Sequence, residues 1–324
     1  MWCFGKAEFA MTPTHAKAGE RLMVALEQLR YVRLFAEDLG LAADFAQRVL
    51  GLEPIDRTQE LATFRSDFRD HTLAFATGDH AVQCVGLEVR HPEDLDAALE
   101  GLLRLGVSAG RGSIDDCALR KVKQMLWFSD FSGNRIELVV RPLNSGWRYF
   151  AGRDAGIRGL ADVIIRSVDI EKDLSIWSGI LGAQISDWAG DAVYLRFDGA
   201  HHRIALFPAG RSGILSVEYA VESVDLLMRN YYVLPDLQVP VLHGPGRRPA
   251  SEQLFLTFAG PSDVHFGFVT ESAVLEWEGR RPRQFPAGAA GLCNWGSECK
   301  IDEFNDAPRG RDRGPPRGKQ ERAI

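Results

Sequence analysis

Short apolar runs recur along the chain, bounded by Gly, Pro, Asn or Asp, and three stretches between them show helical periodicity. The helical stretches run from Asp38 to Gly51, from Pro92 to Leu105 and from Asp169 to Gly182. Pro92 suits a first helical turn, and Gly106 suits a helix stop. The apolar runs predict strands at Tyr31–Glu37, Ala62–Arg65, Thr72–Thr77, Gln83–Val89, Met125–Ser129, Asn134–Val140, Asp162–Val168, Ala192–Phe197, Arg203–Phe207 and Leu215–Val221.

The pattern repeats itself at a nearly constant spacing. Asp38 and Asp169 open equivalent helices 131 residues apart, and Gly51 and Gly182 end them at the same spacing. Three further pairs of segments keep offsets of 131, 132 and 130 residues: 71–75 with 202–206, 87–89 with 219–221, and 130–134 with 260–264. A fixed period indicates copies of one unit. Each copy divides again, so the sequence predicts an α+β fold of four βαβββ modules paired into two domains.

The repeat also sets the expected boundaries. They are a leader at 1–28 that is either not native or disordered, an N-terminal domain at 29–141, a C-terminal domain at 157–270, an extension at 271–302 and a disordered tail at 303–324. Met11 and Met23 are alternative starts. The tail is rich in Arg, Gly and Pro without an apolar period, which favours a solvated segment over a nucleic-acid contact.

Composition and charge argue against several classes of function. The net charge of −6 argues against nucleic acid as the main partner. No run reaches the roughly 18 apolar residues of a membrane helix. Five cysteines are scattered without a CxxC pair, so we expect reduced thiols in a cytoplasmic protein.

Several motifs carry a family resemblance. They are Gly159-Leu-Ala-Asp162, Ala200-His-His-Arg-Ile-Ala-Leu206, Gly244-Pro-Gly-Arg-Arg248, the run from Phe255 to Asp263, and Asn294-Trp-Gly296. Together with the module plan they resemble the vicinal oxygen chelate superfamily (glyoxalases, bleomycin-resistance proteins and extradiol dioxygenases). Within it the chain is similar, over about Leu29 to Cys299, to two-domain type I extradiol catechol dioxygenases of the 2,3-dihydroxybiphenyl dioxygenase type. The resemblance implies paired half-barrels, a metal-free N-terminal copy, homo-oligomers and a role in aromatic catabolism.

The metal ligands implied by the resemblance are altered. In that family two His and one Glu of the second copy hold iron and leave positions open for catecholate and O₂. Here those positions carry Asp162, Ser216 and Gly267. Ser is a poor Fe(II) ligand and Gly has no side chain, so we expect a degenerate metal site and no cofactor.

Of the residues that surround the iron in that family, this chain keeps some and replaces others. His202 matches the family's His that handles the catechol proton, and it is the candidate catalytic residue. His201 precedes it, Arg248 replaces a hydrogen-bonding His, and Thr257 replaces a Tyr, which makes these three the candidate substrate-binding residues. His202 and His71 occupy equivalent positions of the repeat, so a structural role for His202 stays open.

A shifted metal site is an alternative. Glu218 lies two residues beyond Ser216, and His265 lies two residues before Gly267. A step of two keeps the same strand face and moves about 6.6 Å along it. Asp162, Glu218 and His265 would then form a set for Fe(II) or Mn(II). Otherwise Glu218 and His265 lie at the barrel mouth or in hydrogen bonds.

The first copy offers a second set at the equivalent ligand positions, Tyr31, Cys84 and Glu137. Cys84 with Glu137 is either a metal site or a buried structural pair. In the second copy Arg248 either points into the pocket, which favours an anionic ligand such as an aromatic or ring-opened acid, or is a solvated charge. Six aromatic residues either line an apolar pocket or belong to the core: Trp177, Trp188, Tyr194, Phe197, Phe255 and Phe258.

Two functions from different classes follow. The first is an enzyme of the extradiol lineage, which either cleaves rings with an unusual metal set or performs metal-free acid–base chemistry through His202. The second is a protein that binds or sequesters a small aromatic or carboxylate ligand, or a partner subunit.

Overall fold

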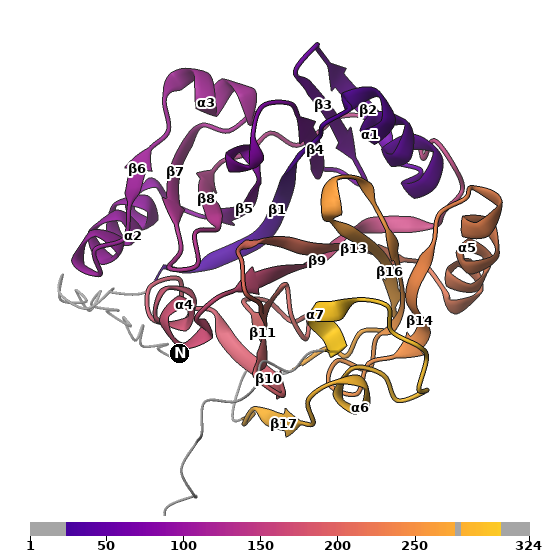
Figure 1. Cartoon of the computed structure of the whole chain (residues 1–324). Helices are drawn as coiled ribbons and strands as arrows, with labels where there is room; N and C mark the ends of the chain where they lie inside the picture. Colours follow the sequence, from indigo (N-terminus) through magenta and orange to yellow (C-terminus); the bar gives the residue numbers. More distant parts are fainter. Residues whose placement is uncertain (1–23, 276–279, 306–324) are drawn as a thin grey trace, which may run out of the picture.

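The computed structural model describes residues 24–275 and 280–305, which form two halves, each built on one curled sheet (Figure 1). The strands of the N-terminal half are β1 (Leu26–Phe35), β2 (Glu53–Arg57), β3 (Leu61–Arg65), β4 (Leu73–Ala76), β5 (Cys84–Val89), β6 (Ala109–Arg111), β7 (Gln124–Ser129) and β8 (Arg135–Val140). Its helices are α1 (Leu39–Phe45), η1 (Ala46–Leu50), η2 (His80–Val82), α2 (Pro92–Arg104) and α3 (Ile114–Leu119).

The C-terminal half repeats this order and adds an extension. Its strands are β9 (Ile157–Ser167), β10 (Gln184–Ala189), β11 (Ala192–Arg196), β12 (Ile204–Pro208), β13 (Gly213–Val221), β14 (Val241–Arg247), β15 (Leu254–Ala259), β16 (His265–Thr270) and β17 (Arg283–Phe285). Its helices are α4 (Ile170–Trp177), α5 (Val224–Asp236), η3 (Pro261–Asp263), α6 (Ala289–Leu292) and α7 (Asp302–Asn305).

Strand order confirms the four βαβββ modules. The sheets run β2-β3-β4-β1-β5-β8-β7-β6 and β14-β15-β16-β13-β9-β12-β11-β10-β17. The first strands of two modules pair antiparallel at each centre, as β1 with β5 and β9 with β13. Each module's last strand returns parallel to its first, as β12 to β9 and β16 to β13. The strands that begin the modules therefore lie at the middle of the curled sheets, and β9 and β13 carry the candidate residues Asp162 and Ser216.

The repeated Asp residues begin the first helix of each half, and Gly51 ends the first helical segment, whereas α4 ends at Trp177, five residues before Gly182. The Asp38 carboxylate accepts a hydrogen bond from the Leu41 amide at 2.9 Å, and Asp169 accepts one from the Lys172 amide at 3.3 Å. These are N-cap bonds, which satisfy amides that have no partner within the helix. Gly51 takes a left-handed φ of +77° where the first helical segment ends, a conformation that favours glycine.

The structure corrects both outer boundaries. β1 begins at Leu26 rather than after residue 28, and the Val24 amide already bonds to the Ile180 carbonyl. The first residues of the expected disordered tail form α7, and its Phe304 side chain is only 5% exposed. The start of β1 is ordered by pairing with β5 and by the Val24 bond to the C-terminal half, and α7 is ordered by burial of Phe304. The rest of the expected leader and tail lies outside the described residues.

The short outer strands β2, β6, β10 and β14 were not predicted from the sequence. β2 alternates between partly and fully exposed residues and buries none, so it carries no apolar run. β14 contains His243 and Gly244-Pro245-Gly246, which resemble turn residues in the sequence. These strands are fixed by pairing with β3 and β15 rather than by local pattern.

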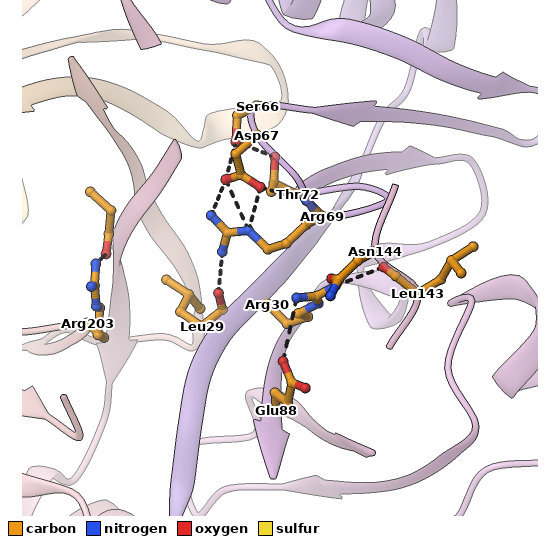
Figure 2. A network of polar contacts seen from close by, with 11 residues as sticks. Leu29, Arg30, Ser66, Asp67, Arg69, Thr72, Glu88, Leu143, Asn144 and Arg203 are labelled. Carbon is orange, nitrogen blue, oxygen red and sulfur yellow. Dashed lines mark hydrogen bonds and ion pairs between the residues drawn. The ribbon is translucent and has the colours of Figure 1, made fainter. Parts of the chain in front are cut away.

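Apolar and polar contacts join the halves. Phe45 packs against Phe266 with ring centroids 5.1 Å apart. Figure 2 shows the polar network beside this interface, where Arg69 binds the Asp67 carboxylate at 2.9 Å and the Leu29 carbonyl at 2.6 Å. A Cβ on Gly159 would lie 2.7 Å from Asp67, so the start of β9 approaches this network closely. The two halves are thus held in one arrangement around the site.

Within residues 24–275 and 280–305, no helix has the length and apolar character that crossing a membrane requires.

Candidate functional site

A row of directly paired residues crosses four strands of the C-terminal sheet. Asp162 on β9 pairs with Glu218 on β13, Glu218 pairs with Gly267 on β16, and Gly267 pairs with Thr257 on β15. Paired residues point to the same face of a sheet. Two of the ligand positions expected from the resemblance, Asp162 and Gly267, therefore lie in one row with Glu218 between them.

Gly267 leaves the space that Glu218 fills. A Cβ at position 267 would lie 3.2 Å from both Cγ and Oε1 of Glu218. Such a contact is tight, so the absent side chain at Gly267 allows the fully buried Glu218 carboxyl to occupy the centre of the row.

We expect Gly267→Ala to push Glu218 away from its partners and to lower the free energy of unfolding by about 1–3 kcal/mol. The matched control is Gly146→Ala, because a Cβ there meets no atom within 4 Å. Urea denaturation of both variants measures the difference, and equal stabilities would contradict the crowding at Gly267.

Arg248 points inward and binds this carboxylate with two parallel hydrogen bonds. Its Nη1 donates to Glu218 Oε2 at 2.8 Å, and its Nη2 donates to Glu218 Oε1 at 2.5 Å. Nη1 also donates to Gln253 Oε1 at 3.1 Å, and Gln253 Nε2 donates to Asp162 Oδ2 at 3.3 Å. The guanidinium carbon lies 4.9 Å from the centre of the Phe255 ring. Arg248 is therefore part of the buried row, and its charge is matched by Glu218.

A chain of hydrogen bonds fixes the tautomer of His202. Asp187 Oδ2, which only accepts, lies 2.9 Å from His201 Nε2, so that nitrogen carries a proton. His201 Nδ1 is then an acceptor, and it lies 3.1 Å from His202 Nδ1, which must donate. Arg283 holds Asp187 from the other side at 2.8 Å. His202 Nε2 is therefore left with a lone pair, directed away from the chain of bonds.

Two acceptor atoms at the floor of a cavity have no hydrogen-bond partner. They are His202 Nε2 and Asp162 Oδ1, which lie 3.5 Å apart and are fully buried. The cavity has a volume of about 330 Å³. Its lining includes Asp162, His202, Gln253, the segment 269–274, Arg158 and Arg203. The arrangement suits a small ligand that donates two hydrogen bonds.

Burial dominates the ionisation of this site. Burial and then the charge of Arg248 lower the pKa of His202 to about 3, so the imidazole is neutral at physiological pH. Burial raises the pKa of the Asp162 and Glu218 carboxyls, against the opposing effect of Arg248. Burial alone would raise the pKa of Asp187, but hydrogen bonds from His201 and Arg283 bring it below its usual range.

His243, on β14, makes stability depend on pH. It is buried against Phe255 with ring centroids 4.6 Å apart, and burial followed by the charge of Arg248 lowers its pKa to about 4. The unfolded chain binds a proton at this His near pH 6.5, so the contribution to stability is present above that pH and is lost as pH falls to about 4. We expect His243→Gln to reduce the slope of unfolding free energy against pH by up to about 1.4 kcal/mol per unit in this window. Urea titrations at several pH values measure it, and unchanged slopes would contradict the prediction.

The structure brings most of the expected site residues together. His201, His202, Arg248 and Asp162 belong to the hydrogen-bonded cluster, and Thr257 lies in the row with an unpartnered Oγ. Ser216 lies two pairs further along β13, opposite Ile164, and its buried Oγ is also unpartnered. The expected residues thus lie close to one another in the C-terminal sheet.

His265 is placed elsewhere. Its charge environment is set by burial and then by Arg166, Glu303 and Asp263. Arg166 is four residues from Asp162 along β9, about 13 Å at the rise of a strand. The structure therefore brings Glu218 to Asp162 but not His265. Among the described residues, no group of three or more His, Cys, Asp or Glu is arranged to hold a metal ion.

Of the six candidate pocket aromatics, two contact the cluster. Tyr194 packs edge-on against His202 with centroids 4.8 Å apart, and Phe255 contacts Arg248 and His243. Phe258 packs with Phe45 of the other half. The remaining three are Trp177 and Phe197, which are buried in the main core, and Trp188, which packs against it. Most of these rings are therefore core residues.

Sequence reasoning missed Gln253, Asp187 and Arg283. Gln253 follows Arg248 in the loop before β15, where it belongs to no motif. Asp187 and Arg283 meet because β17 pairs with β10 across 96 residues of sequence. No local pattern signals this contact, so it could only come from the tertiary structure.

The donor set does not fit the Fe(II) or Mn(II) that the fold family implies. At the three ligand positions only Asp162 offers a side chain that these ions prefer. Gly267 has none, and its space is taken by Glu218. Both oxygens of Glu218 are bound to Arg248, so this carboxylate is already neutralised by a cation.

Comparisons with known proteins show similarity to one superfamily over part of the chain and a shared fold over most of it. Residues 28–138 match the model of the Glyoxalase/Bleomycin resistance protein/Dioxygenase superfamily. An iron-dependent extradiol dioxygenase of Rhodococcus jostii (strain RHA1) is 25% identical over 230 residues, which are 62% of this chain and 75% of that protein.

Two solved structures share the whole architecture. A halotolerant catechol dioxygenase, BphC, superposes with a TM-score of 0.78 at 18% identity and covers 87% of this chain and 97% of its own. A Mn(II)-bound glyoxalase from Novosphingobium aromaticivorans gives a TM-score of 0.78 at 22% identity and covers 88% and 95%. The chain therefore has the same two-domain fold as these two structures.

Proposed function

We propose that the C-terminal half binds a small hydroxylated aromatic compound of the catechol type, or its ring-opened acid, and moves a proton on it through His202 without a metal ion. The observation that supports this most is the buried, unpartnered pair His202 Nε2 and Asp162 Oδ1 at the floor of the cavity. The proposal places the protein in aromatic catabolism, in agreement with the names of its relatives.

The spacing of the two acceptors favours neighbouring hydroxyl groups on the ligand. His202 Nε2 and Asp162 Oδ1 lie 3.5 Å apart, so two adjacent O–H groups of one ring can donate to them together. Leaving either acceptor buried and unpaired costs about 1–3 kcal/mol, which a diol would recover on binding. A ligand without two adjacent donors would recover only part of it.

The proton step follows from the fixed tautomer. A ligand O–H gives its proton to His202 Nε2, and the imidazolium that forms keeps donating from Nδ1 to His201. His201 donates in turn to the ionised Asp187. The positive charge that appears on His202 is thereby stabilised through a hydrogen-bonded chain that ends on a carboxylate.

The carboxylate of a ring-opened acid would bind to an arginine that lines the cavity. Arg248 does not line the cavity, and its charge is matched by Glu218. Arg158 and Arg203 do line it, and Arg203 is bound to Asp198 at 2.7 Å. Arg158 is therefore the residue that we assign to an anionic end of the ligand.

A second candidate function, ligand binding without turnover, is favoured by the low pKa of His202. A base with a pKa of about 3 gives a weak driving force for accepting a proton at neutral pH. A neutral imidazole still accepts a hydrogen bond. The protein would then sequester the aromatic ligand or serve as a partner subunit.

Ligand binding and turnover distinguish these functions. Protein treated with a chelator is titrated with catechol, substituted catechols and phenol by calorimetry, and product formation and O₂ uptake are followed separately. The proposal expects catechols to bind more tightly than phenol, together with keto–enol tautomerisation of a ring-opened acid that needs no O₂. Binding without turnover supports the sequestering function, and equal binding of phenol and catechol contradicts the two-acceptor site. Homo-oligomer formation stays a prediction, which light scattering would test.

A further inference from the structure

We propose that the guanidinium of Arg248 occupies the cation position of the C-terminal half, so that Arg248 and a divalent metal ion exclude each other there. The cation position is the space bounded by Asp162, Glu218 and His202. This inference concerns the metal-free part of the proposed function. Its readout is metal binding rather than turnover, so the two proposals can fail separately.

The contacts of Arg248 are those of a bound cation rather than a surface charge. It is 6% exposed, and it reaches both oxygens of Glu218 directly. It reaches Asp162 through Gln253, which accepts from Arg248 and donates to Asp162. Two buried carboxyls thus converge on one positive group, the arrangement that a buried charge requires.

The N-terminal half also contains a buried Glu bound by an Arg, but its Glu lies on the module's last strand rather than its first. Its equivalent row is Tyr31 on β1, Gly86 on β5 and Glu137 on β8, which are direct pairing partners. The repeat aligns Gly86 with Glu218 and Glu137 with Gly267. Each half therefore has one Glu opposite one Gly, but the two residues have exchanged strands.

An arginine binds the carboxylate in this half as well. Arg120 donates to both oxygens of Glu137 at 2.7 Å, and the Tyr31 hydroxyl donates to Glu137 Oε2 at 2.7 Å. Arg120 lies in the connection between β6 and β7, and Arg248 lies in the equivalent connection between β14 and β15. The internal cation thus recurs in two copies that differ in the strand supplying the carboxylate. This recurrence favours a built-in cation over an accidental ion pair.

Arg248 and a divalent metal ion exclude each other for two reasons, their like charge and their need for the same oxygen atoms of Glu218. A guanidinium and a divalent ion in one buried space would repel each other with little screening. The same two oxygens of Glu218 cannot serve both. In the present arrangement these side chains are not placed to hold a metal ion. Once Arg248 is shortened, the oxygens of Glu218 are released, and Asp162, Glu218 and His202 can move together as two carboxylates and an imidazole, donor types that suit Mn(II).

The test is Mn(II) binding by the full chain, measured by equilibrium dialysis and metal analysis. Wild type is expected to hold no stoichiometric Mn(II) at this position. Arg248→Ala is expected to take up about one Mn(II) per chain, and Arg248→Ala/Glu218→Gln to lose it. Arg247→Ala is the matched control, because Arg247 pairs with the half-exposed Glu271 and should gain no metal. Guanidinium at millimolar concentration should displace Mn(II) from Arg248→Ala.

Every outcome decides the proposal. Uptake by Arg248→Ala that is lost with Glu218→Gln and competed by guanidinium supports it. A folded Arg248→Ala without Mn(II), or a wild type that already binds Mn(II) through Glu218, overturns it. If Arg248→Ala folds only with Mn(II) or guanidinium, the cation requirement is supported. If neither cation restores folding, the proposal is overturned.

Discussion

Glu137→Gln is expected to lower the free energy of unfolding by about 3–5 kcal/mol, the range for breaking a buried ion pair from one side. Glu137 is fully buried and accepts from Arg120, Arg135 and the Tyr31 hydroxyl. The amide keeps the shape of the side chain but leaves the buried Arg120 charge without its counter-ion. Chemical denaturation of wild type and variant under the same conditions measures the loss.

Two controls separate a buried pair from ordinary charge effects. Glu100→Gln breaks the exposed pair with Arg104, and it should cost no more than about 0.5 kcal/mol. Arg120→Met/Glu137→Leu removes both charges together, and most of the lost stability should return. A loss for Glu137→Gln as small as that for Glu100→Gln would contradict a central role for the pair.

His202→Ala is expected to slow keto–enol tautomerisation of a ring-opened acid by about 100- to 10,000-fold, the usual contribution of a positioned proton acceptor. It also removes one of the two acceptors at the cavity floor, so ligand affinity should fall. His202 is fully buried beside Asp162, His201 and Tyr194. Its Nε2 carries a lone pair that no hydrogen bond of the chain from Asp187 through His201 uses. Calorimetric binding and a single-turnover assay measure the two effects separately.

The repeat supplies the matched control for this prediction. His71 is the equivalent of His202 in the N-terminal half, where it lies beside Asp70 and packs against Tyr31 with centroids 5.2 Å apart. His71→Ala should leave binding and turnover of the ligand unchanged. Equal losses from His71→Ala and His202→Ala would point to a general structural effect and contradict a specific role for His202.

Much of the fold is predictable because the residues that begin and end its helices are local signals in the sequence. Asp38 and Asp169 act as N-caps and Gly51 ends a helix with a left-handed conformation, so these signals are readable in the sequence. β2 and β14 are not readable, since their residues become strand only by pairing with neighbours. α7 is hidden for a similar reason, because one buried Phe304 orders a segment of otherwise polar composition.

The site is predictable only in part. The family resemblance locates Asp162, His202 and Arg248, and all three meet in the structure. The resemblance does not reveal that Glu218 fills the space beside Gly267, because that depends on which strand supplies a side chain to a crowded row. Contacts made by the extension, such as Arg283 with Asp187, join residues 96 positions apart and leave no sequence signal.

The measurement that tests the central claim most directly is catechol binding by chelator-treated protein, before and after addition of Fe(II) or Mn(II). With Arg248 and Glu218 paired and His202 neutral, we expect the same affinity with and without metal, and its loss in His202→Ala. Catechol binding or turnover that appears only when Fe(II) or Mn(II) is added would contradict a metal-independent site.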